Sequence, residues 1–155
     1  MWPDRRLCDL LGIEHPIIQA PMAGTTTPAM VAAVSNGGGL GSHGCAALSA
    51  ARLSEDIETL AHATNRPVNL NFFCHRARDI SFAHHALLLE AMAPHYAAAR
   101  VSPPEGLPKT DLAPFGPDHL DCLLKRPPAV VSFHFGLPET EAVAALKAVG
   151  CRILC

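Results

Sequence analysis

The chain has 155 residues, of which 49% are hydrophobic and 17% charged, so its size and composition are those of one globular domain. The formal net charge of −2 argues against binding to a nucleic-acid backbone, since no basic face is concentrated enough to release counterions. The longest apolar runs are too short for a membrane span and the N-terminus lacks a signal peptide, so we expect no membrane association and a cytoplasmic location.

The first predicted elements lead into a proline-terminated apolar run. Residues 4–11 predict a short helix that ends at Gly12, and residues 17–20 predict a buried strand. Pro21 cannot donate to a sheet ladder, so regular pairing should end there. A strand that ends in open backbone just before a helix is how α/β proteins form ligand sites, although an ordinary strand-to-helix turn is about equally compatible with this spacing.

A helix and a glycine-rich segment follow. Thr27 is the expected N-cap of a helix that begins at Pro28 and runs to about residue 35, and we expect Gly37 to end it through a left-handed cap. Residues 38–44 hold several glycines around a short predicted strand at 40–42. Dinucleotide and phosphate-binding loops place their glycines between a strand and a helix, whereas these glycines follow a helix. Close backbone packing is therefore favoured over phosphate binding.

Residues 49–64 predict an amphipathic helix, and residues 68–73 predict the next strand. By alternation, Asn69, Asn71 and Phe73 share one face of this strand. A buried amide without a partner is costly, so these asparagines need hydrogen bonds. The partner is either neighbouring protein or a ligand.

Residues 76–128 form the least regular part of the sequence. A helix over 80–100 that is ended or kinked at Pro94, a proline-rich stretch and a short helix over 117–125 are expected there. A strand over 129–135 follows, and it has His134 near its carboxyl end. A histidine in that place is more often a hydrogen-bonded wall residue than a base.

The chain closes with a helix and a strand. The helix begins at Pro138 with a buried stripe of Ala142, Val143, Leu146 and Val149, and residues 151–155 predict a final strand.

The six cysteines predict free thiols rather than disulfides. None belongs to a Cys-x-x-Cys pair, and the sequence carries no secretion signal. Cys74 and His75 are adjacent and would need a distant partner to bind zinc, but the spacing of metal ligands is absent. We therefore expect no metal site.

Strands that alternate with helices predict an α/β fold with a parallel sheet. Short strands with polar carboxyl ends favour a parallel (β/α) barrel of TIM type over a doubly wound sheet. Such a barrel needs eight units and about 250 residues, whereas this chain supplies four units and a fifth strand. We expect residues 1–155 to form the first half of a single barrel domain, with an irregular excursion at 76–128. Its open sheet edges would permit self-association.

The sequence resembles nitronate monooxygenases, formerly called 2-nitropropane dioxygenases. The matching segments lie in the same order along nearly the whole chain, and together they are specific: residues 11–24, 33–42, 66–73 and 130–136. The resemblance implies an FMN-dependent flavoprotein, an oxidoreductase that oxidises alkyl nitronates with O₂ to a carbonyl compound and nitrite. Its partners would be small molecules.

The resemblance also implies roles for single residues. It places the backbone of Ala20, Pro21 and Met22 and the side chain of Asn71 against FMN, and it makes Gly24, His75 and His134 candidate walls of the pocket. The family's catalytic histidine lies in a segment beyond Cys155, and neither His75 nor His134 matches it. The expectation is therefore an N-terminal fragment that is inactive alone and binds FMN weakly or not at all.

Two alternatives remain at this point. Flavin-dependent enoyl-acyl-carrier-protein reductases look similar in the first strand and the glycine segment, and they would be recognised by NAD(P)H oxidation with an enoyl thioester. The segments 72–75 and 132–136 favour the nitronate enzymes. The other alternative is a half barrel without enzymatic activity that self-associates through its edges.

Overall fold

The computed structural model describes residues 2–76, 81–106 and 112–155. The chain divides into two compact units, the first made of residues 1–75 and 112–155 and the second of residues 76–111. Among the helices of these described ranges, none combines the length and the apolar character needed to cross a membrane.

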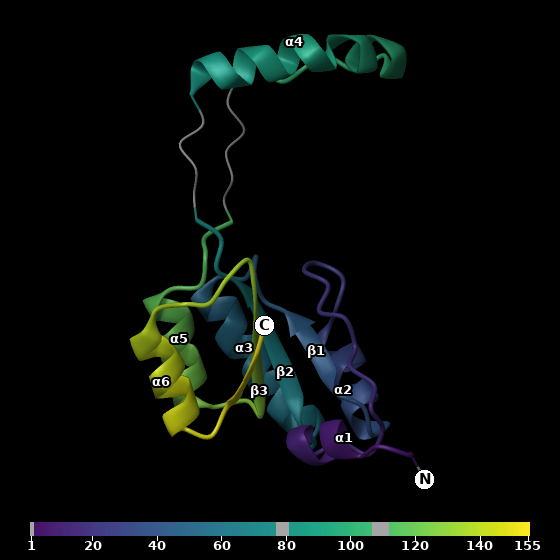
Figure 1. Ribbon diagram of the computed structural model, residues 1–155, viewed down its shortest axis with the longest axis vertical. Helices are drawn as coiled ribbons and strands as arrows, with labels where there is room; N and C mark the ends of the chain where they lie inside the picture. Colours follow the sequence, from purple (N-terminus) through teal and green to yellow (C-terminus); the bar gives the residue numbers. More distant parts are fainter. Residues whose placement is uncertain (1, 77–80, 107–111) are drawn as a thin grey trace. The chain divides into compact units, whose positions relative to one another are not determined.

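The first unit is built on a four-stranded parallel sheet (Figure 1). Its strands follow one another in both sequence and space, in the order β1 (Gly41–Gly44), β2 (Val68–Phe73), β3 (Val130–His134) and β4 (Arg152–Leu154). Every neighbouring pair is parallel. The prediction of an α/β fold with a parallel sheet is confirmed.

Helices connect the strands, and two of them begin at a residue whose side chain caps the first turn. The helices of this unit are α1 (Arg6–Leu11), α2 (Pro28–Asn36), α3 (Ala50–Ala63), α5 (Pro117–Lys125) and α6 (Thr140–Ala148). The Thr27 side chain accepts a hydrogen bond from the Met30 amide, and Ser49 does the same for Arg52. Each hydroxyl satisfies a backbone donor of the first helical turn, which has no partner within the helix.

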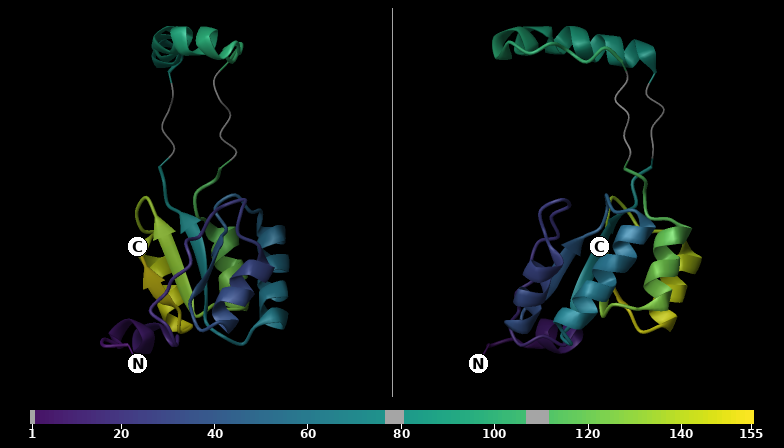
Figure 2. Two further views of the ribbon diagram at one scale, coloured as in Figure 1. Left: turned by 90° about the vertical axis from the view of Figure 1, so that its right-hand side faces the viewer. Right: turned by 180° about the vertical axis from the view of Figure 1, so that it is seen from behind.

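The apolar core lies between the sheet and one layer of helices. In the view from behind in Figure 2, α3 and α5 stand in front of the sheet, and α6 packs against α5 and β4. The largest fully buried side chains include Phe72 and Phe133, whose rings lie 6.4 Å apart between centroids. Phe115 packs edge-on against Phe72 at 5.0 Å. Alternation along the strands sends these side chains to the helix side, which we call the apolar face.

Helix α1 covers the amino ends of the strands. Leu11 and Ile13 are buried in a second apolar cluster with Leu40, which precedes β1, and Val130, which begins β3. Gly12 ends α1 with a φ of 71°, in the left-handed region, as expected for a glycine that closes a helix. This end of the sheet is therefore closed by packed side chains.

The strand predicted at residues 17–20 does not form. Only one isolated parallel bridge forms, between Ile18 and Leu40. Pro16 and Pro21 bracket the segment and supply no amide, so a longer ladder cannot form. Ile17 is also 54% exposed rather than buried.

Two smaller predictions are corrected. Gly37 has a φ of −76°, and the left-handed residue that follows α2 is Gly38, with a φ of 88°. Val149 is 41% exposed because α6 ends at Ala148, before the predicted stripe is complete.

Helix α5 lies within the sequence range of the expected excursion. It belongs to the first unit, where it packs against α3 and α6.

The second unit contains one long helix, α4 (Phe82–Ala99). The Ser81 side chain accepts from the His84 amide at its start. Pro94 lies inside the helix rather than ending it, and Arg100 closes it in a left-handed conformation. The expected start at Ile80 lies outside the described residues.

Candidate functional site

Polar side chains gather on the face of the sheet opposite the helices. We call this the polar face. The parallel register pairs Gly44 with Asn71 and Asn71 with Ser132, so alternate residues of three strands form neighbouring rows. Its members in β1, β2 and β3 are Ser42, Gly44, Asn69, Asn71, Phe73, Ser132 and His134.

Hydrogen bonds join these side chains into a ladder across the strands. Asn71 donates through Nδ2 to Ser132 Oγ at 2.9 Å, and Asn69 donates to the same oxygen at 2.8 Å. Asn69 Nδ2 also reaches Ser42 Oγ at 3.2 Å. The Ser42 amide in turn donates to Oε1 of Gln19 at 3.3 Å. The hydrogen-bond partners that we expected for the two asparagines are therefore mainly serines on adjacent strands.

The ladder leaves two buried polar atoms without a partner in the described part of the chain. These atoms are Nε2 of Gln19 and Oδ1 of Asn69. Exchanging the two ends of the Asn69 amide leaves one polar atom free in either orientation, because two hydroxyls occupy only one end. An unsatisfied buried polar atom costs about 1–3 kcal/mol. Both atoms are enclosed by protein, so an external group reaches them only if neighbouring side chains move.

The segment of Ala20, Pro21 and Met22 lies at the same end of the sheet as Asn71. Gly44, the register partner of Asn71, is in direct backbone contact with it: a Cβ on Gly44 would lie 2.5 Å from the Ala23 nitrogen. Only glycine permits this approach. The Cys45 amide then donates to the Asn71 carbonyl at 2.9 Å. Ala20 and Met22 are exposed residues at this end of the sheet.

His134 and His75 lie at the carboxyl ends of β3 and β2. Nδ1 of His134 lies 3.3 Å from Asn71 Oδ1, and His134 is exposed. Nε2 of His75 lies 3.0 Å from the Leu112 carbonyl, whereas its Nδ1 is buried without a partner among the residues that the structure describes. Gly24 has a φ of 75° with open space around its Cβ position, so its conformation, not crowding, requires glycine there.

Three further residues of this end were not singled out from the sequence. Gln19 belongs to the matching first segment, and Ser42 and Ser132 could have been found by alternation. Phe135 is a separate case, because its φ of 67° is unusual for a bulky residue. Its ring packs edge-on against Phe73 at 4.9 Å. Strained backbone of this kind clusters at functional sites.

The residues present fit a flavin in one respect. An isoalloxazine ring is flat, and the exposed Ala20 and the glycine contact at Gly44 leave part of this end of the sheet without bulky side chains.

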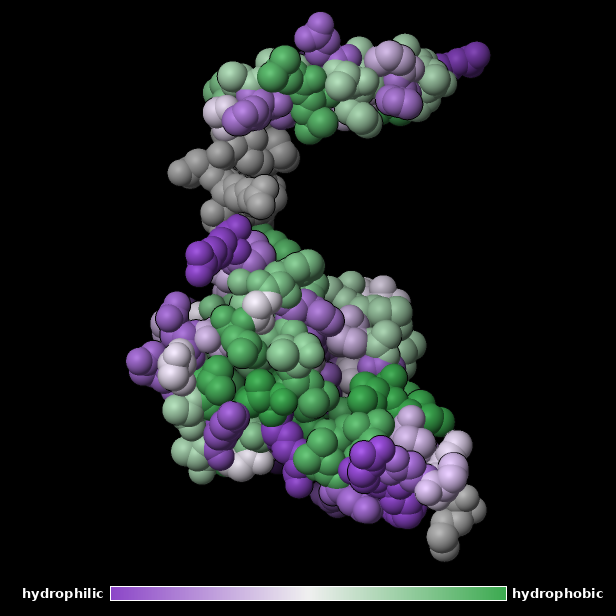
Figure 3. Space-filling model, in the orientation of Figure 1, coloured by the Kyte–Doolittle hydropathy of each residue, from purple (hydrophilic) through white to green (hydrophobic). Residues whose placement is uncertain are grey.

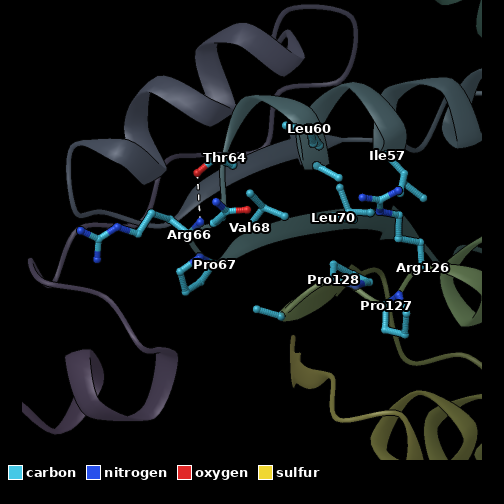
Figure 4. Close-up of a pocket in the computed structure, with 13 residues that line it drawn as sticks. Ile57, Leu60, Thr64, Arg66, Pro67, Val68, Leu70, Arg126, Pro127 and Pro128 are labelled. Atoms are coloured by element: carbon cyan, nitrogen blue, oxygen red, sulfur yellow. Dashed lines mark hydrogen bonds between the residues drawn. The ribbon is translucent and has the colours of Figure 1, made fainter.

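A hollow of about 310 Å³ lies at the opposite end of the sheet from the polar ladder (Figure 4). Apolar residues such as Leu60 and Leu70 line it, and Arg66 and Arg126 stand at its rim. Both guanidinium groups are paired with carboxylates: Arg66 with Glu14 at 2.8 Å and Arg126 with Glu58 at 2.6 Å. This hollow lies at the amino ends of β2 and β3 and shares no residue with the polar ladder.

Burial raises the pKa of several thiols. Cys45, beside Gly44, is fully buried and its Sγ contacts the His43 carbonyl, so its pKa lies far above the ordinary value. Burial also raises the pKa of Cys74 and Cys151. All six cysteines are free, which agrees with the prediction of unpaired thiols.

Comparisons with known proteins point in one direction. The sequence model described as nitronate monooxygenase matches residues 4–155. Nitronate monooxygenases of Paraburkholderia phytofirmans and Pseudomonas aeruginosa are 44% and 43% identical over 151 and 150 residues. These matches cover 97% and 96% of this chain but 41% and 43% of the relatives, so the chain spans less than half the length of either.

Solved structures agree in fold. A nitroalkane oxidase from Streptomyces ansochromogenes is 31% identical with a TM-score of 0.69, and the alignment covers 96% of this chain and 41% of that one. FabK from Thermotoga maritima is 28% identical with a TM-score of 0.64, over 96% of this chain and 35% of that one.

Proposed function

This chain belongs to the nitronate monooxygenase family, and from that premise we propose that it forms the flavin-facing first half of a (β/α)₈ barrel enzyme. The proposed reaction is the FMN-dependent oxidation of an alkyl nitronate with O₂ to a carbonyl compound and nitrite. Support for the half barrel comes from the four-stranded parallel sheet and from the coverage of 41–43% of the relatives. The missing half would supply further strands beside β4.

The observation that carries the proposal is the meeting of two segments at Gly44. The backbone of Met22 and Ala23 lies directly against Gly44, and Asn71 lies beside it on the next strand. The family resemblance assigns FMN contacts to Ala20, Pro21, Met22 and Asn71, and these residues come from parts of the chain about 50 residues apart. Had they lain at opposite ends of the sheet, no common pocket would exist.

Each residue has a definite part in the proposed site. Asn71 is oriented by Ser132 and His134, which occupy both ends of its amide, so it presents a fixed surface to the ligand. The unpartnered atoms of Gln19 and Asn69 are buried and would reach the ligand only through a movement of these side chains. Bound FMN would supply the electron-accepting ring, while the protein fixes its orientation and its local field.

Proton transfer is not assigned to any residue of this chain. The resemblance places the family's catalytic histidine beyond Cys155. His75 contacts the Leu112 carbonyl and His134 contacts Asn71, and we propose both as walls of the pocket rather than as bases. The proposal therefore expects the 155-residue chain to bind FMN weakly and to lack turnover.

A chimaera tests the proposal. Residues 1–155 would replace the matching segment of the Pseudomonas aeruginosa relative, which supplies the remaining part of its own chain. The chimaera should quench FMN fluorescence on binding and consume O₂ with an alkyl nitronate. Asn71→Ala should weaken FMN binding by about ten-fold or more, since it removes an oriented hydrogen-bonding group.

The matched control is Asn65→Ala, which changes the same residue type at an exposed position in the hollow at the opposite end. It should leave FMN binding unchanged. A chimaera that folds but does not bind FMN would contradict the proposed function, as would equal losses in the two variants.

The enoyl-acyl-carrier-protein reductase alternative is separated by the same chimaera. NAD(P)H oxidation that depends on an enoyl thioester would support it, whereas O₂ consumption that depends on a nitronate supports the proposal. The identities of 43–44% to nitronate monooxygenases favour the second result.

Self-association remains a separate proposal for the chain by itself. Strand β4 is an edge of the sheet, with β3 as its neighbour. Figure 3 shows apolar residues gathered on one face of the first unit. Size-exclusion chromatography with the flavin spectrum decides it: a flavin-free dimer supports self-association, and a yellow monomer contradicts it.

A further inference from the structure

A buried hydrogen-bond network joins the turn at residues 22–26 to helix α3. His43 lies on β1 between two polar-face residues, so its side chain points to the apolar face. Its Nε2 lies 2.9 Å from Oδ2 of Asp56, and its Nδ1 lies 3.4 Å from Oγ1 of Thr26. His43 and Asp56 are each 3% exposed, and Thr26 is 6% exposed.

The outer end of this network is anchored at the surface. Oδ1 of Asp56 accepts from Nη2 of Arg52 at 2.9 Å, and Arg52 also faces Glu55 at 3.5 Å. Each oxygen of the Asp56 carboxylate thus has a partner. A buried carboxylate satisfied on both oxygens is a rigid anchor for a histidine ring.

The inner end of the network closes a tight turn at residues 22–26. The Met22 carbonyl faces three donors: the amides of Thr25 at 3.0 Å and Thr26 at 2.9 Å, and the Thr26 hydroxyl at 3.1 Å. The Gly44 amide donates to the Thr26 hydroxyl at 3.0 Å. Thr26 therefore links the turn to the strand residue that touches Ala23.

Chemistry sets the direction of these bonds. The Asp56 carboxylate can only accept, so the His43 ring donates to it through Nε2. In the neutral ring Nδ1 is then an acceptor, and the Thr26 hydroxyl, 3.4 Å away, is the donor that faces it. The Gly44 amide donates to the hydroxyl oxygen, and the Met22 carbonyl keeps its two backbone amide donors. His43 thus orients the Thr26 hydroxyl from the helix side, while Asp56 fixes His43.

We propose that His43, anchored by Asp56, is a positioning residue that fixes the 22–26 turn through the Thr26 hydroxyl. The turn includes Met22, which the proposed function places against FMN. An effect of His43 on FMN binding therefore rests on the proposed function. The network itself is independent of any ligand. An alternative is that the buried pair merely stabilises the packing of α3 on β1, without specific effect on the turn.

Amide hydrogen exchange on the 155-residue chain, without FMN, separates the positioning role from a merely structural role of the pair. The reporters are the amides of Thr25, Thr26 and Gly44, which bond within the network. The reference amides are Leu53, bonded to Ser49 in α3, and Cys74, bonded to His134 at the sheet. Because no flavin is added, the result does not depend on whether the enzyme proposal holds.

The informative variants are His43→Gln and Thr26→Val, with Thr26→Ser as control. Gln keeps an amide near the Nε2 position and so can still reach Asp56, but it does not reach Thr26. Val removes the hydroxyl at nearly constant volume, and Ser keeps it. His43→Gln and Thr26→Val should accelerate exchange at the three reporters by about five-fold or more, with unchanged references, and Thr26→Ser should not.

Equal acceleration of reporter and reference amides would show a merely structural pair and overturn the proposal. Unchanged reporters in His43→Gln would overturn it as well. If His43→Gln does not fold, Asp56→Asn tests the same anchor with little change in volume, and it should accelerate the reporters alone. If neither variant folds, the His43–Asp56 pair is needed for the fold itself, and this result too would overturn the positioning role.

Discussion

On the apolar face of the sheet, Phe72 and Phe133 are buried against aromatic and aliphatic neighbours. On the polar face, Asn69 and Asn71 are just as buried, yet they sit among serines and leave an amide oxygen without a partner. The same four strands thus carry one face whose contacts are complete and one whose hydrogen bonds are not. Complete contacts favour stability, and the face with incomplete hydrogen bonds is the one that we propose faces a ligand.

The largest expected effect is on the apolar face. Phe72→Ala should lower the free energy of unfolding by about 3–5 kcal/mol, because it removes a fully buried ring and leaves a cavity beside Phe115 and Phe133. Denaturant unfolding followed by circular dichroism measures it. A loss below about 1 kcal/mol would show that this face is not the main source of stability.

The contact at Gly44 should come next. Gly44→Ala places a methyl group 2.5 Å from the Ala23 nitrogen, and backbone cannot move away cheaply. We expect a loss of about 1–3 kcal/mol, together with displacement of the turn at residues 22–26. Gly106→Ala, with open space around its Cβ position, is the control and should change little.

Ser132→Ala tests the polar ladder. It removes the oxygen that accepts from both Asn69 and Asn71 and leaves buried amide donors short of a partner. The expected cost is about 1–3 kcal/mol in the same unfolding experiment. A stabilised variant would mean that the ladder is dispensable to the fold.

The extent of prediction from sequence differs between the two faces. Helix starts at Thr27 and Ser49 were predictable because caps and apolar periodicity are local signals. The face shared by Asn69 and Asn71 followed from alternation. Their partner Ser132 lies some 60 residues away, and no local pattern identifies which strands become neighbours.

Two misses have a common physical cause. The 17–20 segment has strand-like residues, but flanking prolines and its place at the margin of the sheet restrict it to one bridge. The second miss is Asp56: apolar periodicity gives no reason to bury a carboxylate, yet Asp56 is buried because His43 of β1 pairs with it. Burial of a charge depends on a partner that only the fold supplies.

A smaller effect is expected from pH. Burial raises the pKa of the Cys45 thiol above its ordinary value of 9.0, so the folded state retains a proton that the unfolded state loses. The stabilisation is complete below pH 9.0 and decreases as the pH rises beyond it, by at most about 1.4 kcal/mol per pH unit. Unfolding titrations from pH 7 to about 10.5 measure this, and Cys45→Ala should flatten the decrease. An equal slope in that variant would contradict the assignment.

The smallest effect on stability should come from Gln19→Ala, because the unsatisfied buried donor that it removes offsets the loss of the long Ser42–Gln19 hydrogen bond of 3.3 Å. We expect a change in the free energy of unfolding below about 1 kcal/mol, but about five-fold weaker FMN binding in the chimaera. Fluorescence titration checks the second value. Unchanged FMN affinity would remove Gln19 from the site.

The central claim is that the carboxyl end of the sheet, at Gly44, faces the flavin. Titration of the ¹⁵N-labelled chain with FMN at millimolar concentration tests it directly, since chemical-shift changes reveal even weak binding. The account predicts that the amides of Met22, Gly44 and Asn71 shift together while those of Asn65 and Arg126 do not. Shifts concentrated at Arg66 and Arg126, around the hollow at the opposite end, would contradict it.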